Sequence, residues 1–228
     1  MRATYEALCA EGYSELTVQS IADRTELSKS AIFYHHDSKE ALLADFVEYL
    51  LEGFEARFEA IADAPAPDRL AAFIEWSLQV PPVEEAGFHT AILELRAQAP
   101  RNDRYRDVLR RADDVLGEAL TAILRDGIAE GRFDEHDPAA LAELLLAAFD
   151  GARVRRLTLD RATYTETVRE ELLERVLADV LAAGVELPAE PAVAVPPDGR
   201  LASAFVQGAG SEGAPNDEER ATSESEAE

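Results

Sequence analysis

Two lysines, Lys29 and Lys39, are the only lysines in this chain of 228 residues, and both fall between residues 16 and 40. Two aromatic residues and two histidines lie between them, in the stretch 33–36. The chain holds 46 acidic against 22 basic residues, a net charge of −24. In so acidic a protein, lysines kept at two nearby positions indicate contact with an anion. Lysine, serine, threonine and tyrosine side chains are common phosphate ligands in protein–DNA complexes, so we expect a phosphate-binding surface here.

Other chemistry has little support in the sequence. There is no G-x-S-x-G motif, no glycine-rich phosphate loop and no H-E-x-x-H pair. Cys9 is the single cysteine, which excludes an intramolecular disulfide and a multi-cysteine metal site, and we expect it in the core of the first helix. His35 and His36 are adjacent, so on a helix they point about 100° apart and rarely share one ion. We therefore expect no enzyme, no metal site and no cofactor.

Composition also bears on where the chain resides. No run approaches the roughly 18 apolar residues of a membrane helix, and no signal peptide is apparent, so we expect a cytoplasmic protein without a membrane partner. Residues 188–228 hold nine acids and two bases, or −7, which leaves −17 of the total −24 in residues 1–187. Acidity spread this evenly, with arginine in place of lysine, suggests a halophilic host with high internal salt. An ordinary acidic cytosolic protein is the alternative.

Two short helices are expected to position the lysine-containing stretch. Thr17 is a predicted N-cap for a helix from 18 to about 24, and Ser28 for a second helix from 29 to about 35. Leu27 is expected to fill the gap between them. Two short helices so connected form a helix-turn-helix, here at about 17–36, whose second helix enters the major groove of DNA. Ser38 is expected to cap a longer third helix.

The rest of the chain up to residue 187 also has helical patterning, without the alternation typical of strands. Segments 138–157 and 164–183 carry broad apolar faces. We expect them to form an intermolecular four-helix bundle in a homodimer, with packing inside one protomer as the alternative. The predicted interface residues are Leu141, Leu145, Phe149, Leu172, Val176, Leu177 and Val180. Residues 188–228 have few large apolar side chains, and we expect an acidic disordered tail.

The stretch AEGYSELTVQSIADRTELSKSAIFYHHDSKEALL, residues 10–43, resembles the N-terminal domain of the TetR family of transcriptional regulators. The positions that match are Gly12, Tyr13, Thr17, Ile21, Ala22, Phe33, Tyr34, His35, His36, Ser38, Lys39, Glu40, Leu42 and Leu43. Residues 94–160 resemble, less specifically, the C-terminal domain of BetI-like members. Three positions depart from the family pattern: Leu27 and Ser30 stand where glycine is usual or frequent, and His36 replaces a phenylalanine.

The resemblance implies an all-α fold with two domains. Residues 1–46 would form a three-helix DNA-binding domain, and residues 47–187 a larger effector-binding and dimerisation domain. It implies a dimeric regulator, a repressor of a palindromic double-stranded DNA operator that an unknown small-molecule effector releases. Phosphate contacts would come from Thr17, Tyr34 and Lys39, and base contacts from Ser28, Lys29, Ser30 and Ala31, with Phe33 and His35 at the rim. An acidic helical protein-interaction adaptor without DNA binding is the alternative.

The effector pocket has a weaker sequence signal. Ligand pockets are mostly apolar with a few placed polar groups. The candidate lining residues are therefore the aromatics Phe73, Trp76, Phe88 and Phe149, with His89 and Tyr105 as polar contacts. For each of them, packing in the core is the alternative.

Overall fold

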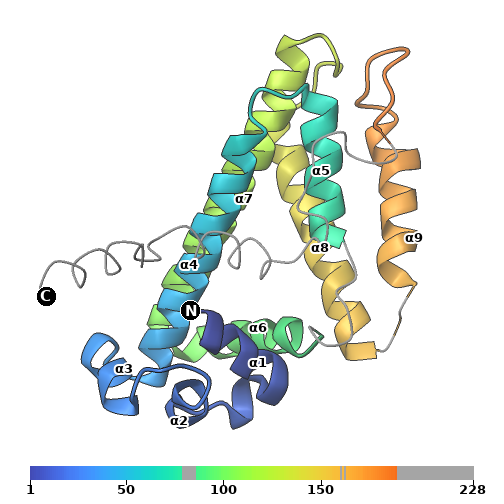
Figure 1. The fold of residues 1–228 in the computed structure, drawn as a ribbon. Helices are drawn as coiled ribbons and strands as arrows, with labels where there is room; N and C mark the ends of the chain where they lie inside the picture. The colour runs from blue at the N-terminus through green and yellow to red at the C-terminus, as the bar shows by residue number, and fades with distance from the viewer. Residues whose placement is uncertain (79–85, 160, 162, 189–228) are drawn as a thin grey trace, which may run out of the picture.

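The computed structural model describes residues 1–78, 86–159, 161 and 163–188. The described residues form an all-α fold without a β-strand, in agreement with the prediction (Figure 1). The predicted tail lies, apart from Pro188, outside the described residues. The α-helices are α1 (Arg2–Glu15), α2 (Val18–Ala22), α3 (Lys29–His35), α4 (Lys39–Ala60), α5 (Ala66–Leu78), α6 (Ala86–Gln98), α7 (Asp103–Ala129), α8 (Pro138–Leu159) and α9 (Tyr164–Glu171).

The predicted caps of the first helices are confirmed. The hydroxyl oxygens of Thr17, Ser28 and Ser38 each accept a hydrogen bond from the backbone N–H three residues later, which satisfies a donor that the helix leaves unpaired. The α2 helix is shorter than predicted and ends at Ala22. The prediction for Leu27 is wrong, because its side chain is 55% exposed. The side chains through which α2 and α3 enter the common core are Val18, Ile21 and Ala22 of α2 and Ile32 of α3.

Two hydrophobic clusters lie along the pair of long helices α4 and α7, which pack side by side (Figure 1). The first cluster joins α1–α3 to the start of α4, and α6 and the start of α7 complete it. The second holds the end of α4 with α5, α8, α9 and the rest of α7. The boundary expected between residues 46 and 47 falls inside α4, and α6 packs against α1. Motion of α6 therefore reaches the first cluster directly.

The C-terminal helices differ in part from the prediction. The α8 helix begins at Pro138 with Asp137 as its cap, whose carboxylate accepts from the N–H groups of Ala139 and Ala140. The helix expected to reach residue 183 gives way after Glu171 to a π-helical segment, Leu172–Leu177. Beyond it the backbone pairs with the loop after α7, through Asp134 N–H to Val180 O and Ala182 N–H to Arg132 O. This pairing takes over the backbone groups that a continuing helix would use.

The residues predicted for the dimer interface serve the protomer itself. Leu145, Phe149, Leu172, Leu177 and Val180 are buried in the second cluster. Leu141 and Val176 are half-buried against it. The reason is that α7 and α9, together with α5, pack against α8 and cover its apolar face. The apolar side chains of α8 that do reach solvent are Leu144, Val154 and Leu159.

Candidate DNA-binding surface and ligand pocket

Helix α3 exposes most of its side chains. Ile32 is buried and Ala31 is half-buried, whereas Lys29, Ser30, Phe33, Tyr34 and His35 are exposed, Tyr34 by 85%. The helix start is held by Ser28, whose Oγ accepts from Ala31 N–H at 3.1 Å and lies 2.9 Å from Ser30 Oγ. Thr17, at the start of α2, is also exposed. The structure thus keeps the residues predicted to contact DNA on one short, capped element and its neighbour.

The four basic residues of positions 1–46, all of which the structure describes, differ in availability. Arg2 pairs with Glu6 and Arg24 with Glu11, each at 2.8 Å. Lys39 donates from Nζ to the backbone carbonyl of Tyr13 at 2.7 Å. Lys29 alone among the four has neither an acidic partner within 4 Å nor a hydrogen bond, and its Nζ lies 6.0 Å from the Phe33 ring. Lys29 is therefore the cation of this region that a DNA phosphate or base can engage without displacing a partner.

Lys39 has an intramolecular role that the sequence does not reveal. Its ammonium group lies 4.6 Å from the centroid of the Tyr13 ring, as well as bonding the Tyr13 carbonyl in the last turn of α1. Burial lowers the pKa of Lys39, and the nearby carboxylate of Glu40 opposes that shift. The contact ties the first turn of α4 to the end of α1. Because 26 residues separate the partners, no local pattern could have indicated it.

His36, which departs from the family pattern, is also tied down. Its Nδ1 lies 2.8 Å from a carboxylate oxygen of Asp45 on α4. The imidazole thus uses a polar partner at a position where the family packs a phenylalanine. The contact anchors the C-terminal end of α3 to α4.

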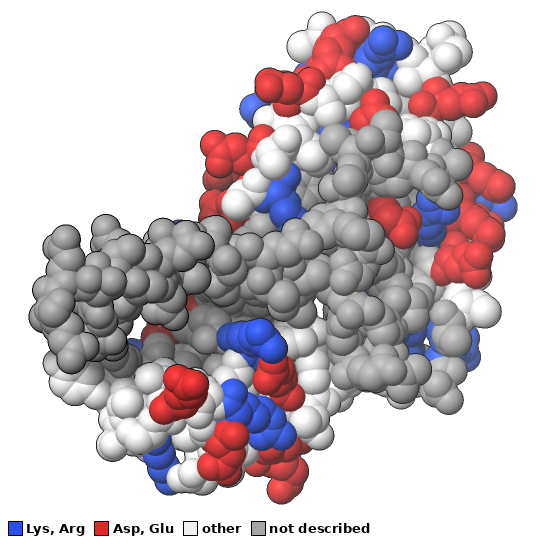
Figure 2. All heavy atoms as spheres, viewed as in Figure 1, with Lys and Arg blue, Asp and Glu red and all other residues white. Residues whose placement is uncertain are grey.

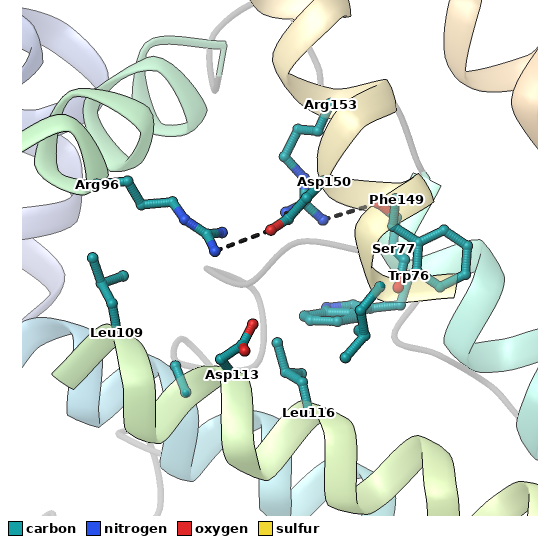
Figure 3. A pocket seen from close by; sticks show the side chains of 11 residues that line it. Trp76, Ser77, Arg96, Leu109, Asp113, Leu116, Phe149, Asp150 and Arg153 are labelled. Carbon is teal, nitrogen blue, oxygen red and sulfur yellow. Dashed lines mark hydrogen bonds and ion pairs between the residues drawn. The ribbon is translucent and has the colours of Figure 1, made fainter. Parts of the chain in front are cut away.

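A cavity of about 70 Å³ lies between α5, α6, α7 and α8 (Figure 3). Trp76 and Phe149, both predicted, and Leu116 form part of its apolar wall. The residues of its polar wall are not among the predicted ones. Asp150 pairs with Arg96 at 3.0 Å and with Arg153 at 3.2 Å. The sequence signal was present in hindsight: Phe149, Asp150 and Arg153 lie within about one turn of a helix whose inner face is otherwise apolar.

Two further groups complete the polar wall. Arg153 also donates to the backbone carbonyl of Ser77 at 3.0 Å. The hydroxyl of Ser77 is buried and has no hydrogen-bond partner. The Asp113 carboxylate lies at the cavity as well, on an exposed part of α7. A buried hydroxyl without a hydrogen-bond partner is available to bind a ligand or a water molecule.

The other predicted pocket residues divide into three cases. Phe73 is buried behind the cavity, with its ring 5.8 Å from Trp76 and 6.3 Å from Phe149. Phe88 and Tyr105 belong to the first cluster, against Tyr5 and Tyr13 respectively, so they do not line the cavity. His89 faces α8. Burial, followed by the positive charges of Arg153 and Arg156, lowers the pKa of His89 to about 4.

Helix α6 connects the cavity to α1 (Figure 1). Besides Arg96, it carries Glu94, whose carboxylate accepts a hydrogen bond from the backbone N–H of Tyr13 at 3.1 Å. At its start, a Cβ added to Gly87 would lie 2.3 Å from the carbonyl oxygen of Cys9, so only glycine allows this approach of α6 to α1. One helix therefore touches both the ligand cavity and the DNA-binding region.

Three further features of the described residues are the charge on the surface, the apolarity of the helices and the grouping of possible metal ligands. Acidic residues are scattered over the upper and lower parts of the face in Figure 2, with basic residues among them. No helix in the described part of the chain combines the length and apolarity needed to cross a membrane. Among the described residues there is likewise no group of three or more histidine, cysteine, aspartate or glutamate side chains that could hold a metal ion.

Known proteins share both parts of this architecture. Residues 1–46 match the family of bacterial regulatory proteins called tetR, and residues 66–183 match the C-terminal domain of BetI-type transcriptional repressors. The crystal structure of a TetR transcription regulator from Haloarcula marismortui is 36% identical, covering 78% of this chain and 95% of that chain, with a TM-score of 0.70. A putative transcriptional regulator from Saccharomonospora viridis, solved in complex with choline, shares the fold at 24% identity, covering 79% and 96% of the chains, with a TM-score of 0.67.

Another relative is named for a different function. The nucleoid occlusion factor SlmA of Vibrio cholerae is 26% identical over 151 residues, which are 66% of this chain and 77% of that protein. The two family matches and the Haloarcula structure agree with the helix-turn-helix geometry described above. The chain belongs to the TetR family of transcriptional regulators, and its C-terminal part is of the BetI type.

Proposed function

We propose that this protein is a homodimeric, cytoplasmic repressor that binds a palindromic DNA operator through α3 and releases it when a small molecule enters the α5–α8 cavity. The observation that carries the DNA-binding part is the exposed, capped start of α3 with Lys29 unpaired. Lysine can donate to O6 and N7 of guanine, and the Ala31 methyl can meet the methyl group of thymine. Ser28 and Ser30 complete this base-reading set.

Phosphate contacts are proposed for Thr17, Tyr34 and Lys39, with Phe33 and His35 at the rim. Lys39 can fill this role while keeping its bond to Tyr13, because an ammonium group has three N–H donors. A phosphate contact carries no sequence information. Lys39→Ala should therefore weaken binding to all DNA sequences alike, whereas Lys29→Ala should also change which base pairs are preferred. Equal loss of preference in both variants would contradict these roles.

The proposed dimer uses the outer face of α8. Leu144, Ala147, Gly151 and Val154 are all exposed and follow one another at helical spacing of three or four residues, so they share one face. A Cβ added at Gly151 would meet nothing within 4 Å, which leaves room for close approach of another helix. Two such faces related by a two-fold axis would present two α3 helices to two half-sites of an operator.

Release of DNA is proposed to pass through α6. Arg96 contacts the cavity and Glu94 contacts α1 on the same helix, so a ligand that displaces Arg96 from Asp150 also strains the bond to Tyr13. An allosteric effect requires two sites that bias one element, and α6 meets that requirement.

A host with high internal salt is part of the proposal. It is supported by the net charge of −24 and by the relative from Haloarcula marismortui. High net charge maintains solubility where salt screens repulsion.

An electrophoretic mobility shift with the DNA upstream of the protein's own gene, run in molar potassium chloride, tests the proposal. A specific complex is expected with the wild type and none with Lys29→Ala. Failure of the wild type to bind would instead favour an acidic protein-interaction adaptor. That alternative draws on the charge of residues 1–46, four bases against eight acids, and on the engagement of three of those bases within the protein.

A further inference from the structure

Arg156 lies on α8 three residues after Arg153, which lines the cavity. Its side chain is half-buried, and its Nε is fully buried without a hydrogen-bond partner. Its guanidinium has no carboxylate within 4 Å in the part of the chain that the structure describes. In a protein with 46 acids and 22 bases, a half-buried arginine without an acid is unexpected. Buried charges are normally paired, so the guanidinium of Arg156 is available to pair with the anion of a bound ligand.

Two more nitrogen-bearing side chains face the same place. Arg153 lies three residues before Arg156 and therefore on the same face of α8. His89 lies on α6, which packs against α8, and the positive charges of both arginines contribute to its low pKa. The one carboxylate bonded there, Asp150, is already shared between Arg96 and Arg153. The junction of α6 and α8 is thus locally positive and rich in N–H donors.

The cavity beside this junction supplies an apolar wall. Trp76, Phe149 and Leu116 line it, and the unpartnered hydroxyl of Ser77 is buried at the same site. The cavity of about 70 Å³ is smaller than the roughly 150 Å³ that holds a benzene ring. A ligand must therefore open the pair between Arg96 and Asp150, both of which are partly exposed. That opening is also the movement of α6 proposed above.

Asp113 favours the opposite ligand, a cation held between its carboxylate and the Trp76 ring. Its side chain is exposed, however, whereas Arg156 and Arg153 are half-buried. An exposed charge is already solvated by water and gains little from a counter-ion. A charge in a less polar environment gains more, because Coulomb attraction grows as the effective dielectric constant falls. The balance of the site therefore favours an anion.

We propose that Arg153, Arg156 and His89 bind the carboxylate of a small organic anion, whose apolar body enters the cavity beside Trp76 and Phe149. This inference rests on the proposed function, because it names the chemical class of the effector. The carboxylate would accept from Arg156, whose buried Nε has no hydrogen-bond partner among the described residues, and would compete with Asp150 for Arg153. No bond is made or broken in the ligand.

Benzoate and benzylammonium each contain one aromatic ring but have opposite charges, and together they test the chemical class of the proposed ligand. Thermal unfolding of the full chain in potassium chloride, without DNA, reports their binding. Benzoate should raise the melting temperature and benzylammonium should not. A larger shift with benzylammonium, or no shift with either, would overturn the proposal.

Arg156→Gln, compared with Arg155→Gln, tests the residue assignment. Both changes remove one positive charge from neighbouring positions of α8, but Arg155 is exposed and donates to Tyr164 on α9. Arg156→Gln should lose about tenfold or more in benzoate affinity, as expected for a charge-assisted hydrogen bond, and Arg155→Gln should not. If Arg156→Gln fails to fold, Arg156→Lys serves as the test variant. It keeps the positive charge and should retain part of the benzoate affinity. Equal benzoate affinity in Arg156→Gln and Arg155→Gln refutes the site. Since DNA is absent, these results stand apart from whether the protein binds an operator.

Discussion

The salt dependence of operator binding is where this protein should differ most from a basic repressor. Residues 1–46 hold eight acids, and three of them, Glu6, Glu11 and Asp45, pair with basic or histidine side chains. The other five, eight less three, have no such partner within 4 Å among the described residues. At low salt these carboxylates repel DNA over about 10 Å, whereas near 1 M salt the screening length falls to about 3 Å. Raising the salt therefore removes repulsion.

The opposing effect is the release of counterions by Lys39, the lysine proposed to contact a phosphate. Each neutralised phosphate contributes a log–log slope of about −0.9, so one lysine per half-site gives a dimer about −2. Between about 0.2 and 2 M potassium chloride, that contribution alone would weaken binding about a hundredfold. Screening of five unpaired acids per protomer acts against it over the same range. We therefore expect affinity that is flat or rises with salt, and no slope steeper than about −2.

Fluorescence anisotropy of a labelled operator, titrated with protein across that salt range, measures the slope. A basic repressor with 6–10 phosphate contacts would show a slope of about −5 to −9. A slope that steep would refute the proposal of one cationic phosphate contact per half-site, made by Lys39. It would also remove the argument for adaptation to high salt, although the family assignment would stand.

A neutralising variant separates the two effects. Glu26 is exposed immediately before α3 and has no ion-pair partner. Glu26→Gln should strengthen binding at the lowest salt and leave binding at the highest salt almost unchanged, which makes the slope more negative. Glu118→Gln, an equal charge change at an exposed position of α7, should leave the slope as it is. A larger change of the salt slope in Glu118→Gln than in Glu26→Gln would contradict repulsion of DNA by the nearby acids.

Three further expectations concern assembly and stability. Leu144→Glu should yield monomers by light scattering in molar salt and abolish operator binding, because it places a charge on the proposed α8 face; a persistent dimer would exclude that face. Gly127→Ala should lower the free energy of unfolding by about 1–3 kcal/mol or more, since its Cβ would lie 2.0 Å from the Phe133 ring, whereas Gly117→Ala on the same helix meets nothing closer than 3.8 Å and should be neutral or stabilising in chemical denaturation. Burial lowers the pKa of His89 to about 4 in the folded protein, from an ordinary value of 6.5. The unfolded chain therefore binds the proton first, and the free energy of unfolding should fall as the pH drops from about 6.5 to 4. His89→Gln should lessen that fall, and an unchanged pH profile would contradict burial of a neutral imidazole.

Local chemistry explains which parts of this protein its sequence could predict. The caps at Thr17, Ser28 and Ser38 depend on a side chain and a backbone N–H three residues away, so the helix starts followed from the residues themselves. The exposed start of α3 followed as well, because its single buried residue, Ile32, leaves the other faces to solvent. The all-α fold and the family were predictable for the same reason, since the matched motif is contiguous.

Contacts between distant segments were decided only by the tertiary structure. The bond from Lys39 to Tyr13, the approach of Gly87 to Cys9 and the packing of α6 on α1 join segments that no period or spacing connects. The apolar face of α8 was visible in the sequence, yet its width did not reveal that Leu145 packs inside the protomer while Leu144 reaches solvent. Burial depends on which neighbours cover a face, and here α7, α9 and α5 do so. The local sequence thus determined the helices and placed Arg153 and Arg156 on one face of α8, whereas only the packing of α6 against α8 brought the helix that carries His89 to that helix.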